Sequence, residues 1–163
     1  MDEISVKPAV PEDFERLCEL SLAMFREHHQ LDPTFFAPLR DPLIDHGRFT
    51  AGIADSECRY LVAWSAGVAL GFILARVSRS SNVPVFVPCD FVNVDELFVV
   101  LQARNRGVAQ RLFDATKCWA VDKRITTIRL GVYTCCTAAV AFWKKQEFAP
   151  YKNLLELGII NLE

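Results

Sequence analysis

The stretch of residues 94–113 constrains the fold most, because it predicts a buried strand, a short loop and a helix in direct succession. Its first seven residues are mainly apolar and β-favouring, the composition of a strand covered on both faces. After Gly107 an apolar series recurs at helical spacing through residues 108–120. The first N–H groups of such a helix have no partner within it, and its dipole favours negative charge there. The stretch therefore predicts a phosphate or pyrophosphate bound where the helix begins.

The loop itself narrows the possible phosphate-binding motifs. It reads Arg104-Asn105-Arg106-Gly107-Val108-Ala109 and brings positive charge to the helix start. The chain contains no G-x-x-x-x-G-K-[ST], which excludes a P-loop, and no G-x-G-x-x-G, so a dinucleotide-binding turn is not supported. The alternative interpretation is an ordinary strand–turn–helix corner with surface arginines.

Length and composition limit the classes of protein to which this chain can belong. A chain of 163 residues is long enough for a real core, so we predict a single domain over residues 1–163. The apolar fraction of 52% argues against disorder, and the net charge of −2 argues against a general nucleic-acid binder. No stretch approaches ~18 consecutive apolar residues, and the first residues lack the pattern of an export signal. We therefore expect a cytoplasmic protein without nucleic-acid or membrane partners.

The cysteines and histidines do not show the spacing of a metal site. The six cysteines form no C-x-x-C pair, and the chain has only three histidines. We expect reduced thiols, no disulfide framework and no metal.

The rest of the chain predicts helices and strands in a definite order. An irregular segment rich in proline follows the first helix, and Gly71, inside a hairpin strand, suggests a bulge or a close backbone approach. The predicted elements are a strand at 4–7, a helix at 11–28, an irregular segment at 28–48, a hairpin of strands at 59–64 and 68–77, the strand and helix described above, a strand at 126–132, a helix beginning at Thr134 or Thr137, and a final strand at 154–159.

This order and the central loop resemble the GNAT superfamily of N-acetyltransferases from end to end. The loop is similar to the acyl-CoA pyrophosphate loop of that family, written R/Q-x-x-G-x-G/A. Ala69-Leu70-Gly71-Phe72 resembles its v-G-f step, Leu97-Phe98-Val99 its l-y-V, and residues 142–148 its l-Y-x-k-x-G-F. The resemblance implies an α/β (α+β) chain with the GNAT acyl-CoA N-acyltransferase fold, a mixed, mostly antiparallel central sheet flanked by helices.

The resemblance also implies a reaction and its ligands. GNAT enzymes transfer an acetyl group from the cosubstrate acetyl-CoA to an amine by direct attack, without a metal, and dimers are common among them. The acceptor would be an amine-bearing small molecule or peptide. A backbone N–H around Val99 could stabilise the oxyanion. The residues that the resemblance assigns to acetyl-CoA are Leu97, Phe98, Val99, Arg104, Asn105, Arg106, Gly107, Val108, Ala109, Cys136 and Trp143.

The catalytic groups are the least defined part of the prediction. The attacking amine must be neutral, and since a lysine-like amine has a pKa of about 10.4, a general base helps. Glu96 and Asp95 are the candidates; because neighbouring strand residues alternate faces, we expect at most one to point toward the substrate, and we favour Glu96.

A general acid is a separate question. The family commonly has tyrosine where Trp143 stands, and an indole cannot protonate a leaving thiolate. Tyr133 is the alternative acid, unless none is needed. The missing tyrosine also motivates a second hypothesis, a non-catalytic module that binds or senses acyl-CoA.

Overall fold

The computed structural model describes residues 3–80 and 83–157, and the chain divides into two compact units, residues 1–131 and 132–163. Among these described residues, the first unit contains a five-stranded sheet with three α-helices, and the second contains one α-helix. The elements are β1 (Ser5–Pro8), α1 (Phe14–Leu31), α2 (His46–Ala54), β2 (Cys58–Ser65), β3 (Val68–Arg79), β4 (Asp90–Val99), α3 (Val108–Asp122), β5 (Ile128–Leu130) and α4 (Thr137–Lys145), with single 3₁₀ turns at Pro11–Asp13 and Leu101–Ala103.

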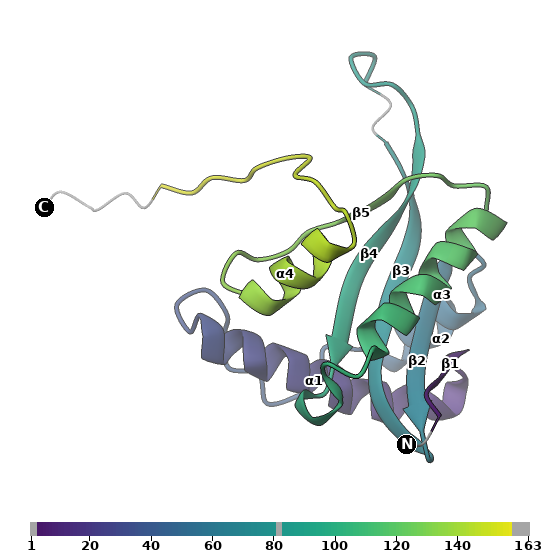
Figure 1. The fold of residues 1–163 in the computed structure, drawn as a ribbon, viewed down its shortest axis with the longest axis vertical. Coiled ribbons are helices and arrows are strands. Elements are labelled where there is room, and N and C mark those ends of the chain that lie inside the picture. Colours follow the sequence, from purple (N-terminus) through teal and green to yellow (C-terminus); the bar gives the residue numbers. More distant parts are fainter. Residues whose placement is uncertain (1–2, 81–82, 158–163) are drawn as a thin grey trace, which may run out of the picture. The chain divides into compact units, whose positions relative to one another are not determined.

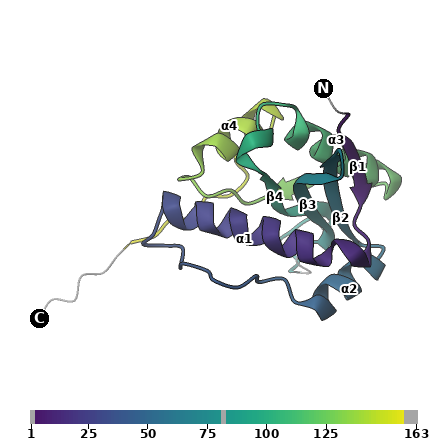
Figure 2. The same cartoon turned by 90° about the horizontal axis from the view of Figure 1, so that it is seen from below.

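The sheet has the strand order β1-β2-β3-β4-β5. The first four strands pair antiparallel, and β5 pairs parallel with β4. Helix α3 packs on one face of the sheet, and α1 and α2 pack on the other (Figures 1 and 2). The predicted fold class, a mixed and mostly antiparallel sheet flanked by helices, is confirmed.

Apolar residues at helical spacing bury each helix against the sheet. On α1, Leu17, Leu20 and Met24 join a core cluster that includes Phe72 of β3 and Phe98 of β4. Burying one such side chain contributes about 1.5–3 kcal/mol relative to leaving it exposed. The other face is filled from α3, whose buried residues are Val108, Leu112, Phe113, Thr116, Trp119 and Ala120.

Gly71 brings β3 unusually close to the end of β4. It pairs with Val99, and a Cβ at this position would lie 2.3 Å from the carbonyl oxygen of Phe98 and 3.0 Å from the Cα of Val99. Any larger residue would push the two strands apart. The close approach predicted for this glycine is therefore confirmed, and it fixes the end of β4 against β3.

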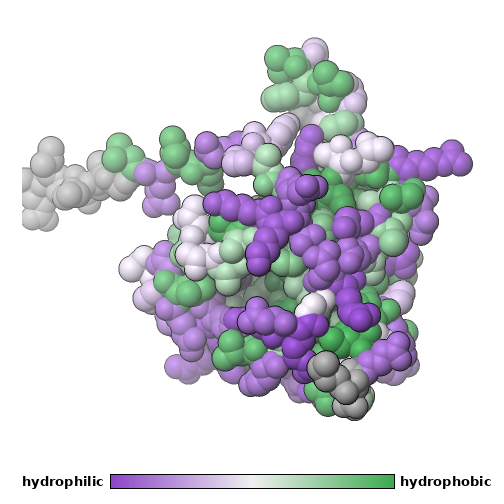
Figure 3. Space-filling view, in the orientation of Figure 1, coloured by the Kyte–Doolittle hydropathy of each residue, from purple (hydrophilic) through white to green (hydrophobic). Residues whose placement is uncertain are grey.

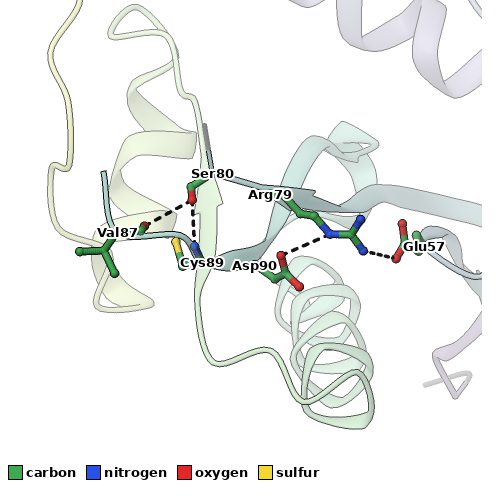
Figure 4. Close-up of polar contacts among 6 residues, drawn as sticks. All are labelled: Glu57, Arg79, Ser80, Val87, Cys89 and Asp90. Carbon is green, nitrogen blue, oxygen red and sulfur yellow. Dashed lines mark hydrogen bonds and ion pairs between the residues drawn. The ribbon is translucent and has the colours of Figure 1, made fainter. Parts of the chain in front are cut away.

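Polar contacts brace the base of the long β3–β4 hairpin. Arg79 lies between Glu57 and Asp90, with N···O distances of 3.3 and 3.4 Å (Figure 4). Ser80 accepts a hydrogen bond from the Cys89 N–H at 2.8 Å and donates one to the Val87 carbonyl at 3.3 Å. Beyond this base the connection projects past the sheet (Figure 1), and its tip is apolar and exposed (Figure 3); the exposed residues are Val83, Val85, Phe86 and Val87.

Three predicted elements differ from the observed ones. The irregular segment is confined to residues 32–45, because Asp45 caps α2 by accepting the Arg48 N–H at 2.9 Å. Strand β5 is shorter than the predicted 126–132. The final strand is wrong over residues 154–157, which have no regular structure, and residues 158 and 159 lie outside the described residues. Apolar, β-favouring residues form a strand only when a second strand pairs with them.

In the part of the chain that the structure describes, no helix has the length and apolar character needed to cross a membrane.

Candidate active site

A β-bulge interrupts β4 in the middle of the predicted site. Leu74 of β3 pairs with Glu96, whereas the next β3 residue, Ala75, pairs with Val94. Asp95 is therefore an extra residue in β4. The alternation of side chains shifts by one at this point, because two residues of β4 oppose one position of β3.

The bulge places the Asp95 carboxylate beside Glu96. Asn93 donates from Nδ2 to Oδ1 of Asp95 at 2.6 Å, and Arg76 donates from Nε to Oδ2 at 2.6 Å. Asn93 and Arg76 are opposite each other, and Glu96 pairs with Leu74, which shares the face of Arg76. The expectation that Asp95 and Glu96 would point to opposite faces is therefore wrong, because the bulge removes the alternation on which it depended.

Glu96 has the environment of a general base. Its Oε2 is buried and has no hydrogen-bond partner among the described residues. Burial, and to a smaller extent the charge of Asp95, raise the pKa of Glu96 to about 7 against the opposing effect of Arg76. A carboxyl with this pKa is about half ionised at neutral pH and can accept a proton there. Carboxyl groups with strongly shifted pKa values cluster at functional sites.

Tyr60 lies in the same cross-strand row as Glu96. It pairs with Leu74 on one side of β3, and Leu74 pairs with Glu96 on the other. Burial raises the pKa of Tyr60, and the nearby Cys58 and Glu96 raise it further, so its hydroxyl stays protonated at neutral pH. The row therefore offers a neutral hydroxyl and a titratable carboxyl on one face of the sheet.

Among the described residues, no strand pairs with the outer edge of β4 near its end. Pairing with β5 covers Val92 to Val94, whereas β4 continues to Val99. Because Val100 donates its N–H to the Leu70 carbonyl on the β3 side at 2.9 Å, alternation directs the Val99 N–H to the opposite edge. The end of β4 thus presents main-chain groups that β5 does not pair, as expected for a site that binds a peptide-like arm.

The loop before α3 has the backbone of an anion site. Asn105 and Gly107 adopt left-handed conformations, with φ of 59° and 78°. Gly107 caps the helix, and its carbonyl accepts the first helical hydrogen bond from the Arg111 N–H at 3.0 Å. The N–H groups of Val108 and Ala109 therefore precede the helical hydrogen-bond pattern and are directed out of the helix start.

The two arginines of this loop differ in what they contact. Arg104 donates from Nε to the Val99 carbonyl at 2.9 Å and forms an ion pair with Glu27 of α1 at 2.5 Å. It therefore links the end of β4 to α1 and orients the Val99 peptide. Arg106 is exposed. Of the two cations considered for the phosphates, Arg106 is the one whose side chain lies at the surface of the loop.

Three of the predicted site residues belong to the second unit, residues 132–163. Tyr133 is 50% exposed. Cys136 caps α4, and burial together with the neighbouring Cys135 raises its thiol pKa to about 11, so the thiol stays protonated at neutral pH. Trp143 packs against Phe142 and Phe148, with ring centroids 4.8 and 5.3 Å away.

Sequence reasoning did not identify Arg76, Asn93, Tyr60 or Glu27 as parts of the site. The sequence does mark Arg76 as unusual, because it is a charged residue inside an otherwise apolar strand. No sequence feature indicates the bulge itself, because neither glycine nor proline occurs there. The ion pair between Glu27 and Arg104 joins residues far apart in the chain and becomes visible only in the folded structure.

Comparisons with known proteins agree with this architecture. The model of the acetyltransferase (GNAT) family matches residues 15–148 of the chain. A sequence search of curated proteins finds no match. Among solved structures, a mutant of the BH1408 protein from Bacillus halodurans is 19% identical, with a TM-score of 0.88, over 96% of this chain and 99% of that one.

Two further structures carry names that state an activity. The aminoglycoside N-acetyltransferase AAC(6′)-Iy, in complex with CoA, is 19% identical, with a TM-score of 0.73, over 98% of this chain and 96% of that one. The aminoglycoside acetyltransferase meta-AAC0020 from an uncultured soil metagenomic sample, in complex with trehalose, is 11% identical, with a TM-score of 0.70, over 96% and 95% of the two chains. At these identities the likeness shows the fold.

Proposed function

Because this chain belongs to the GNAT acetyltransferase family, we propose that it transfers the acetyl group of acetyl-CoA to the primary amine of a small molecule or peptide. One observation carries the proposal. A single strand, β4, supplies both a buried carboxyl with a pKa of about 7 and a main-chain edge that β5 does not pair near Val99, and the loop after it leads to the start of α3.

The described residues fit acetyl-CoA at two points. The loop at 104–109 offers backbone N–H groups at a helix start and the exposed Arg106, which suit a pyrophosphate. The edge of β4 near Val99 offers main-chain groups to the amide-containing arm. That the AAC(6′)-Iy structure contains CoA supports acetyl-CoA as the cosubstrate of a chain with this fold.

The chemistry removes two protons from the acceptor nitrogen and needs one site for developing negative charge. Glu96 accepts the first proton from the ammonium form of the acceptor, and the neutral nitrogen then attacks the thioester carbonyl carbon. The second proton leaves the nitrogen for water when the tetrahedral intermediate collapses. The N–H of Val99 stabilises the oxygen that becomes negative. The carbon–sulfur bond breaks and the coenzyme leaves as a thiolate, which needs no strong acid because its pKa is near 8.5. Tyr133 is the proposed acid if a proton is supplied to that thiolate.

The rival function is a non-catalytic module that binds acyl-CoA. The tryptophan at position 143 motivates it, because the family commonly uses a tyrosine there to protonate the leaving group. The buried Glu96 favours the enzyme, since a module that only binds acyl-CoA has no use for a base with a pKa near 7.

We also propose a homodimer as the working form. The second unit exposes three leucines at 92, 90 and 85%, namely Leu154, Leu155 and Leu157. Soluble monomers rarely leave so much apolar side chain in water, and two-fold dimers are the commonest oligomers. Light scattering coupled to size exclusion tests this point, and a mass of one chain at micromolar concentration would contradict it.

The first test of the function is thermal unfolding with and without saturating acetyl-CoA, with ATP and NADH as controls. Binding at ~100 times the dissociation constant stabilises a protein by about 2.7 kcal/mol, which raises the midpoint clearly. A rise with acetyl-CoA alone supports the proposal, and thiol release with a panel of amines then separates an enzyme from a binding module. No rise at millimolar acetyl-CoA would count against both functions.

A further inference from the structure

We infer that the acceptor is a monoamine carried on an aromatic body, which binds along a row of aromatic side chains leading from β4 to the protein surface. The inference rests on the proposed function and names the substrate class of the same site. It depends on two observations, the continuity of this row and the pairing of the carboxylates around it.

The inner end of the row lies against the core cluster that contains Phe98 of β4. Phe98 lies two residues beyond Glu96 in β4 and belongs to the apolar cluster on the face covered by α1. Phe25 of α1 packs against this cluster. Because α1 crosses the sheet on this face (Figure 2), an acceptor that reaches Glu96 from this side meets the second half of α1.

Ring contacts continue the row to the surface. The His28 ring lies 6.0 Å from that of Phe25 and stacks on Phe36, with centroids 4.9 Å apart and an interplanar angle of 20°. Phe36 contacts Phe35 edge to face at 5.0 Å, and Phe35 is 57% exposed. We call Phe25, His28, Phe36 and Phe35 the aromatic row. It spans α1 and the beginning of the α1–α2 connection.

Two features make the row an ordered and uncharged surface. A ring nitrogen of His29, Nδ1, lies 2.6 Å from the Phe36 carbonyl oxygen and holds the connection against α1. Burial lowers the pKa of His28, against the smaller effect of Glu27, so its imidazole is neutral at physiological pH. The row therefore adds no positive charge that would repel an ammonium ion, and its ring faces attract one.

Three other carboxylates, on β4, on α1 and in the α1–α2 connection, are already engaged. Asp95 is paired with Arg76 and Glu27 with Arg104. Asp32 accepts hydrogen bonds from the Thr34 hydroxyl and from the N–H groups of the same turn, at 2.6 to 3.2 Å. Within residues 3–80 and 83–131, the Oε2 of Glu96, two residues before Phe98 in β4, is the buried carboxyl oxygen that has no hydrogen-bond partner.

This charge arrangement selects against polycations. Each ammonium group that leaves water needs a carboxylate or another acceptor in return, so an aminoglycoside requires several acidic partners. A site with one unpartnered carboxyl and several rings suits one amine on an apolar aromatic body. The acceptor class inferred here therefore differs from the aminoglycosides named for the solved relatives AAC(6′)-Iy and meta-AAC0020.

The test compares kcat/KM, by thiol release at saturating acetyl-CoA, for 2-phenylethylamine, ethanolamine and kanamycin. We expect kcat/KM for 2-phenylethylamine to exceed that for ethanolamine by about 10- to 100-fold, because burying one apolar group of this size stabilises the bound acceptor by a corresponding amount. Phe35→Ala should lower that preference about fivefold, through KM rather than kcat. Phe86→Ala is the matched control, since Phe86 is 55% exposed at the tip of the β3–β4 hairpin and should leave the ratio unchanged.

Acetyl-CoA binding, measured by thermal shift on each variant, distinguishes a wrong acceptor class from a wrong proposed function. If acetyl-CoA binds and kanamycin or ethanolamine is the better substrate, the acceptor class is wrong and the proposed function stands. If acetyl-CoA does not bind, both fail. If it binds and no amine turns over, calorimetric titration of 2-phenylethylamine into the CoA-saturated protein decides, and equal affinity for the wild type and Phe35→Ala overturns the inference.

Discussion

The loop before α3 and the bulge in β4 supply the two halves of the proposed site, and they are built from different parts of the chain. The loop works through its backbone, with Asn105 and Gly107 in left-handed conformations and N–H groups directed out of the helix. The bulge works through side chains that three strands bring together, namely Tyr60, Arg76, Asn93, Asp95 and Glu96.

This difference explains how each half responds to substitution. A site made of backbone groups tolerates most side-chain changes and fails when the backbone conformation changes. A site made of side chains keeps its backbone and loses its chemistry when one partner is removed. The loop should therefore control acetyl-CoA affinity, whereas the bulge should control turnover and pH dependence.

The largest effect is expected for Glu96→Gln. Removing the base should lower kcat by about 10²- to 10⁴-fold, because proton transfer contributes that much, while acetyl-CoA affinity stays within twofold. Steady-state kinetics with thermal shift measures both. Glu19→Gln is the control, since Glu19 sits in an exposed ion pair with Arg16 on α1. Full activity of Glu96→Gln would mean that Glu96 is not the base.

The second effect is on stability. Since burial raises the folded-state pKa of Glu96 from 4.5 to about 7, the protein should lose stability as the pH rises from 4.5 through 7. The loss is up to about 3 kcal/mol, and Glu96→Gln should not show it. Urea unfolding of both proteins at pH 5 and pH 8 measures the difference. If the difference in unfolding free energy between the wild type and Glu96→Gln is the same at pH 5 and pH 8, burial does not raise the pKa of Glu96.

The third effect compares two glycines with the same conformation. Gly107 and Gly67 both have φ of 78° and open space where a Cβ would lie. Alanine should cost about 1 kcal/mol at either position, because the left-handed conformation is strained for it. Only Gly107→Ala should weaken acetyl-CoA binding, by about fivefold, since only that strain reaches the loop N–H groups. Equal acetyl-CoA affinities of the two variants would remove the loop from the site.

The smallest effect separates the two arginines of the loop. Arg106→Gln should raise the KM for acetyl-CoA about two- to fivefold at low salt and less at high salt, as expected for an exposed charge near phosphates. Arg104→Gln should instead lower kcat and stability, because it frees Glu27 and the Val99 carbonyl. A pure, salt-dependent KM effect of Arg104→Gln would make it a phosphate ligand.

Much of this architecture could be predicted from the sequence, because it depends on local patterns. The strand, loop and helix of residues 94–113, the order of elements and the close approach at Gly71 follow from periodicity, glycine placement and the resemblance to the GNAT family. The final strand failed at residues 154–157 for the opposite reason, since a strand exists only through pairing that no local pattern supplies.

The tertiary structure alone decided how the catalytic end is arranged. The sequence placed Asp95 and Glu96 next to each other but could not reveal the bulge that puts both on one face, or the Arg76 that pairs with one and leaves the other buried. The reason is physical. Backbone conformation at a turn is set largely by neighbouring residues, whereas the pKa of a carboxyl depends on burial and on charges that folding brings from distant strands.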